Sequence, residues 1–182
     1  MTLRKTEILQ RWDDRLRRAE LAVAAVLFTA LACVVTWGTC ARALGSPLIW
    51  SDETAVLLMA SAAFPAASAL LAEDGHVAIT LLERRVPPGM ARAIGIARDV
   101  SLLLIFLALA VLVWRWFAPV AEIARLVGQK TDGFPNFMYS EPTATLGLNK
   151  VWFWLSLPIF CIGVCFHTVV RIAARRGKSA SC

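Results

Sequence analysis

Cysteine and histidine side chains are candidate metal ligands in this 182-residue sequence. Cys161, Cys165 and His167 lie close together, but a structural zinc site needs a fourth ligand, and none is evident. No two of the five cysteines form the Cys-x-x-Cys pair of a thiol oxidoreductase: Cys33, Cys40, Cys161, Cys165 and Cys182. The sequence therefore predicts no metal site.

The two histidines, His76 and His167, could instead ligate one haem together. His76 follows Gly75 at the edge of an apolar stretch, whereas the cofactor ligands of helical bundles point inward from within a helix. We therefore expect no cofactor. A membrane anchor or cytochrome-like subunit of an electron-transfer complex stays an alternative function.

Acidic side chains are absent from the longest apolar stretches. Four stretches carry no charge at all: residues 21–41, 54–72, 100–114 and 151–170. Ion-coupled carriers commonly place ionisable side chains or broken helices near the membrane midplane. The sequence thus disfavours a carrier that works alone, and it offers no catalytic or substrate-binding residue.

These stretches are long enough to span a membrane. The chain is 58% hydrophobic and 18% charged, against roughly 25% charged residues in soluble domains. A helix needs about 20 residues to cross a hydrocarbon layer of about 30 Å. We expect an all-α membrane protein, a single domain over 1–182, with four transmembrane helices at about 20–41, 53–72, 93–116 and 151–171. The first exceeds the apolar core of a cleaved signal peptide, about 7 to 15 residues, so we expect an uncleaved anchor.

Basic and aromatic residues predict the orientation of the spans. Fourteen of the 19 lysines and arginines fall on the side of the two termini, and the positive-inside rule assigns that side to the cytoplasm. Six of the seven tryptophans fall near the outer ends of spans, which agrees with this orientation. We expect both termini in the cytoplasm and attribute the net charge of +6 to topology, not to binding of nucleic acid.

The segments outside the spans are short. Ile8, Leu9, Trp12 and Leu16 recur at helical spacing among basic residues, which favours an N-terminal amphipathic interfacial helix over about 4–18. A charged leader without fixed structure is the alternative. A periplasmic loop over about 117–150 carries exposed apolar residues, for which lipid headgroups and another protein are equally open as contacts.

The second span combines an acidic start with small residues. Ser51 can cap the helix, and the acids Asp52 and Glu53 suit the positive end of its dipole. Ala62 and Ala66 lie four residues apart on one face, where small side chains let two helices approach closely in lipid. That partner helix belongs either to this chain or to another subunit.

Several short motifs resemble the small membrane subunit, or Q subunit, of tripartite ATP-independent periplasmic (TRAP) transporters. In order, they are Arg42, Trp50-Ser51-Asp52-Glu53, Gly75-His76-Val77, Leu81-Leu82 and Pro87. Four spans with both ends inside, Pro158 in the last span and Arg171 after it also match the plan of that family. The resemblance covers most of the chain.

The resemblance implies a sodium-driven importer of organic acids in the bacterial inner membrane. In such a system a periplasmic substrate-binding protein delivers the substrate to a large multi-span membrane subunit. The small subunit is then a non-catalytic scaffold, with the large subunit, the binding protein and membrane lipid as partners. Its candidate interface residues are Arg42, Trp50, Asp52, Glu53, Ala62, Ala66, Gly75 and His76.

Overall fold

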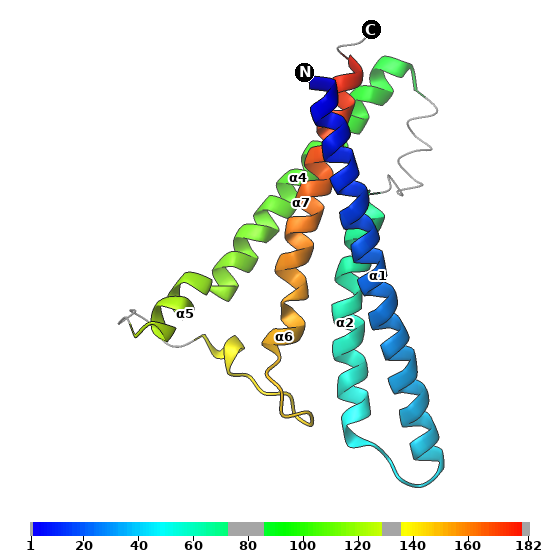
Figure 1. Ribbon diagram of the computed structural model, residues 1–182, viewed down its shortest axis with the longest axis vertical. Coiled ribbons are helices and arrows are strands. Elements are labelled where there is room, and N and C mark those ends of the chain that lie inside the picture. Colours follow the sequence, from blue (N-terminus) through cyan, green and yellow to red (C-terminus); the bar gives the residue numbers. More distant parts are fainter. Residues whose placement is uncertain (1, 73–85, 129–135, 180–182) are drawn as a thin grey trace.

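The computed structural model describes residues 2–72, 86–128 and 136–179, and this part of the chain is predominantly helical (Figure 1). Its elements in chain order are α1 Thr2–Ala43, α2 Ile49–Ala72, α4 Pro88–Phe117, α5 Pro119–Leu126, the 3-10 helix η1 Phe137–Tyr139, α6 Val151–Trp154 and α7 Ser156–Ser179. Within the described segments, the extended pairing is one isolated bridge between Pro142 and Asn149.

Four stretches of helix are long and apolar enough to cross a membrane: Glu7–Ala43, Ile49–Ala72, Gly89–Leu126 and Val151–Ala174. This confirms the predicted all-α fold with four candidate spans. The side of the membrane that each end faces stays a prediction. The two ends of the described chain lie at the same end of the molecule, which we call the terminal end, and the opposite end is the loop end (Figure 1).

The N-terminal segment does not form a helix separate from the first span. α1 runs without a break for 42 residues, which at about 1.5 Å per residue is roughly twice the thickness of the hydrocarbon layer. The physical reason is that neither glycine nor proline occurs before Gly38, so nothing ends the helix between 4–18 and the apolar part. Whether this segment contacts the membrane surface stays a prediction.

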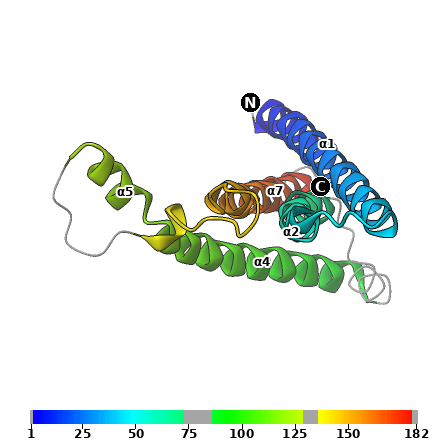
Figure 2. The same cartoon turned by 90° about the horizontal axis from the view of Figure 1, so that it is seen from below.

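α7 is the central helix of the bundle. It packs against α1, α2 and α4, and α1 and α2 form an antiparallel hairpin beside it. Figures 1 and 2 show α4 on the side of α7 away from α1 and leaning away from the hairpin toward the loop end. The core follows this arrangement, since Phe160 of α7 contacts Phe64 of α2 and Phe106 of α4 at ring centroid distances of 5.5 and 5.6 Å.

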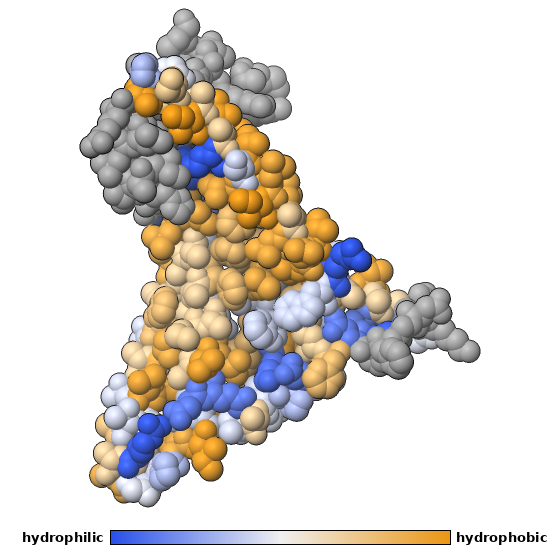
Figure 3. Space-filling view, turned by 180° about the vertical axis from the view of Figure 1, so that it is seen from behind, coloured by the Kyte–Doolittle hydropathy of each residue, from blue (hydrophilic) through white to orange (hydrophobic). Residues whose placement is uncertain are grey.

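The outer surface of the helices is largely apolar. Figure 3 shows hydrophobic residues over the middle of the molecule and most of the hydrophilic residues of this face toward the loop end. Exposed side chains on α1 and α4 include Val26, Trp37, Leu104, Ile105 and Leu112. A surface of this kind suits lipid or the helices of another membrane protein.

Candidate partner interface and buried charge network

His167 links two helices at the terminal end of the bundle. Its side chain is fully buried on α7, and each ring nitrogen lies against a carboxylate of α1. Nδ1 is 2.7 Å from Oδ1 of Asp13, and Nε2 is 3.0 Å from Oε2 of Glu20. Asp13 and Glu20 are seven residues apart, so both acids project from the same face of α1 toward α7.

Glu20 also receives a contact from α2. Ser68 donates its hydroxyl hydrogen to Oε1 of Glu20 at 2.8 Å. A Cβ added to Gly163 of α7 would collide with the carboxylate of Glu20 and would come within 2.7 Å of Oγ of Ser68. Glycine at this position therefore lets three helices meet around a single carboxylate.

The geometry favours a charged His167. A carboxylate oxygen can only accept a hydrogen bond, so two ionised acids require a proton on both ring nitrogens. Such an imidazolium, flanked by Asp13 and Glu20, is a charge triad in which neither nitrogen is left to ligate a metal or haem. In the described segments, moreover, no group of three or more His, Cys, Asp or Glu side chains could hold a metal ion.

A second buried ionic cluster joins α4 to α7 and α2. Nη2 of Arg98 and Nε of Arg171 lie 3.0 and 3.5 Å from Oδ1 of Asp99. Arg171 also donates from Nη1 to the carbonyl oxygen of Leu71 at 2.7 Å, near the C-terminal end of α2. A cation at this end of a helix is favourable for the helix dipole. The two clusters are adjacent, since Arg171 lies four residues after His167 on α7.

The candidate interface residues at the loop end make contacts within the chain. Nη2 of Arg42 pairs with Oδ1 of Asp52 at 3.0 Å, and both side chains are exposed. Glu53 accepts hydrogen bonds from the backbone N–H groups of Ala144 and Thr145 at 2.7 and 2.8 Å. Glu53 thus fastens the loop before α6 to the start of α2.

Three further interface candidates differ in exposure. Trp50 is 37% exposed, while Ala62 is completely buried, so its small side chain serves packing within this bundle. Ala66 is half-buried. Partner contact at all of these positions stays a proposal. The candidates Gly75 and His76, and with them the haem pairing of His76, lie outside the described residues.

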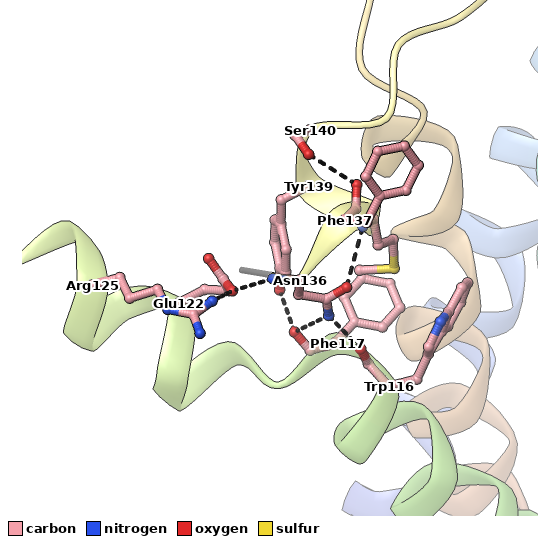
Figure 4. Close-up of polar contacts among 9 residues, drawn as sticks. Trp116, Phe117, Glu122, Arg125, Asn136, Phe137, Tyr139 and Ser140 are labelled. Atoms are coloured by element: carbon pink, nitrogen blue, oxygen red, sulfur yellow. Dashed lines mark hydrogen bonds and ion pairs between the residues drawn. The ribbon is translucent and has the colours of Figure 1, made fainter. Parts of the chain in front are cut away.

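A polar cluster at the loop end holds α5 beside the end of α4 (Figure 4). The backbone N–H of Asn136 donates to Oε1 of Glu122 at 3.0 Å, and its side-chain amide donates to the carbonyl oxygen of Trp116 at 2.6 Å. The Tyr139 hydroxyl donates to the carbonyl oxygen of Phe117 at 2.8 Å. Burial raises the pKa of Tyr139, and the negative charge of Glu122 raises it further, so this hydroxyl keeps its proton.

Sequence reasoning missed the two buried clusters. Asp13 falls within the predicted interfacial helix and Glu20 at the start of the first predicted span, and the sequence alone assigns no role to either acid. The available signal was spacing, since acids seven residues apart share a helix face, as do His167 and Arg171, four residues apart in the last helix. The sequence alone does not show that these two faces meet.

The fold and the site together define an all-helical, multi-pass membrane protein whose buried ionic groups join its own helices. Residues 31–177 match the family model of tripartite ATP-independent periplasmic transporters, DctQ component, and the chain belongs to this family. It is thus a small permease subunit of a TRAP transporter, as the resemblance implied. No curated protein sequence matches the chain.

Membership of this family confirms several coarser expectations. The DctQ component belongs to a transporter, not to an enzyme family. In TRAP systems it works with the large membrane subunit DctM and the binding protein DctP. The family and the four candidate spans together indicate a multi-pass protein of the inner membrane.

Proposed function

We propose that this chain is a non-catalytic scaffold for the large membrane subunit of a sodium-driven importer of organic acids. The observation that carries the scaffold role is the way its buried ionic groups are used. Among the described residues, the buried side chains of Glu20, Asp99 and His167 all have ionic partners within the bundle. Ionic groups that are paired inside the bundle join its helices to one another, which is what a scaffold requires.

The outer surface supports the same proposal. The exposed apolar side chains of α1 and α4 offer a broad contact area for other membrane helices. Sodium coupling and organic acids as substrates follow from the family and belong to the large subunit and the binding protein. The small subunit then holds the large one in place while that subunit moves the substrate.

Uptake by a reconstituted system tests this proposal. The large subunit and the binding protein are reconstituted in liposomes with and without this chain, and uptake of a labelled organic acid is measured with and without an inward sodium gradient. We expect uptake only when the chain and the gradient are both present. The chain alone should give no uptake, and sodium-dependent transport by the chain alone would contradict the scaffold role.

Interface variants make the test more specific. Trp50→Ala should weaken co-purification of the large subunit, because it removes an aromatic side chain at the start of α2 that we propose to contact that subunit. Trp152→Ala is the matched control, since Trp152 is 68% exposed on α6, outside the apolar surface of α1 and α4. Equal co-purification of both variants with the large subunit would show that Trp50 is not part of the interface.

A further inference from the structure

The polypeptide turns sharply between α4 and α5. Ala118 has a φ of 42°, in the left-handed region, and Pro119 begins the next helix. Figures 1 and 2 show that α5 consequently projects away from the other helices at the loop end. The inside of this turn forms a groove of about 420 Å³, lined by Trp114, Arg115 and residues of α5 that include Val120 and Ala124.

The two faces of α5 differ in their contacts. The polar face makes contacts within the chain: Glu122 forms an ion pair with Arg125 at 2.6 Å and accepts a hydrogen bond from the backbone N–H of Asn136 (Figure 4). The opposite face carries three large apolar side chains that are 60 to 87% exposed: Val120, Ile123 and Leu126. A helix with one polar and one apolar face typically lies in the plane of a membrane interface.

The residues next to the turn are of the kinds that favour the lipid headgroup layer. Trp114 and Trp116 are 61% and 45% exposed on the last turn of α4, and tryptophan prefers this layer. The exposed apolar side chains of Ile105 and Leu112 precede them on the same helix. The exposed apolar surface of α4 therefore continues onto the apolar face of α5.

Arg115 adds a positive charge to this apolar groove. Its side chain is exposed. Glu122, the acid nearest to it in the sequence, accepts hydrogen bonds from the side chain of Arg125 and the backbone N–H of Asn136. A guanidinium group binds a phosphate through paired hydrogen bonds. The groove thus combines a phosphate-binding cation with walls that suit the upper part of an acyl chain.

We propose that the turn between α4 and α5 binds a phospholipid of the leaflet at the loop end. Arg115 contacts the lipid phosphate, and the apolar face of α5 lies over the acyl chains beside it. This site anchors the loop end of α4 in the membrane, at the place where α4 diverges from the hairpin of α1 and α2.

Photocrosslinking distinguishes lipid from protein as the occupant. The full chain, purified with the subunits that accompany it, is placed in nanodiscs of phosphatidylethanolamine and phosphatidylglycerol. A benzoylphenylalanine replaces Ile123, or Ser140 as a control, because Ser140 is an exposed polar residue at the same end. We expect phospholipid adducts at position 123 and few at 140. Crosslinks from position 123 to another polypeptide, or equal lipid yields at both positions, would overturn the proposal.

A second measurement tests the role of Arg115. In the chain with the photoreactive residue at position 123, Arg115→Gln should lower the phosphatidylglycerol adduct about fivefold, while Arg115→Lys should keep most of it. Arg42→Gln is the matched control, because Arg42 is also an exposed arginine at the loop end but pairs with Asp52. An unchanged adduct yield in Arg115→Gln, with normal thermal unfolding, would show that Arg115 does not hold the phosphate.

Discussion

Glu20 is the residue on which three helices of the bundle converge. It accepts a hydrogen bond from Ser68 of α2 and faces His167 of α7, and the absence of a side chain at Gly163 makes room for its carboxylate. A charge buried among apolar helices is costly unless its partners are in place. Removing any one partner therefore affects the others.

Loss of His167 should destabilise the bundle strongly. His167→Ala leaves the carboxylates of Asp13 and Glu20 without the cation that they share, and breaking a buried ionic contact costs about 3 to 5 kcal/mol. Thermal unfolding in mild detergent measures the loss. Arg42→Gln, which removes an exposed ion pair, should change stability by less than about 1 kcal/mol. Similar losses in the two variants would contradict the importance of the triad.

Gly163 should not tolerate even a methyl group. In Gly163→Ala the new Cβ collides with Glu20 and Ser68, and such overpacking typically costs about 1 to 3 kcal/mol. Gly89→Ala is a suitable control, because nothing lies within 4 Å of a Cβ at that helical position. The control should be neutral or slightly stabilising, since alanine favours helix over glycine. A stable Gly163→Ala variant would mean that Glu20 can move aside at little cost.

At the scale of elements, the sequence predicts helices better than their junctions. The four apolar stretches lie within the four helical stretches that could span a membrane, the last of which joins α6 to α7, because spanning length and hydrophobicity are local properties. The continuity of α1 differs from the separate interfacial helix that the sequence predicts, because a change from charged to apolar composition does not end a helix that no glycine or proline interrupts. The contacts of Glu53 with residues about 90 positions later also could not be predicted, since they depend on how the loop folds back.

The loop before α6 should be released when Glu53 loses its charge. Glu53→Gln weakens the hydrogen bonds that the backbone N–H groups of Ala144 and Thr145 donate to it. Because a hydrogen bond to a charged group is worth about 1.5 to 3 kcal/mol, amide exchange at these two residues should rise at least about tenfold. Hydrogen–deuterium exchange with mass spectrometry measures this. Asp52→Asn, one residue earlier, should leave exchange in the loop unchanged, and equal effects would argue against a specific tether.

At the scale of the whole molecule, the helices are held together most firmly at the terminal end. The Asp13–Glu20–His167 triad and the Arg98–Asp99–Arg171 cluster both lie in the half of the bundle where α7 ends. Toward the loop end α4 leans away from the hairpin (Figure 1). The ionic contacts therefore join α1, α2, α4 and α7 at the terminal end, and the helices spread apart toward the loop end.

The orientation of this bundle in the membrane gives a test of the whole topology. Fourteen of the 19 basic residues fall on the side of the termini, so Gly89 at the start of α4 should face the cytoplasm. A cysteine is placed at Gly89, or at exposed Ser46 between α1 and α2, in a chain whose five native cysteines are replaced. An impermeant thiol reagent applied to intact cells whose outer membrane has been removed should label Ser46→Cys and spare Gly89→Cys until the inner membrane is opened. The reverse pattern would invert the topology, because the two positions lie at opposite ends of the bundle, and it would place the buried charge clusters in the outer half of the membrane.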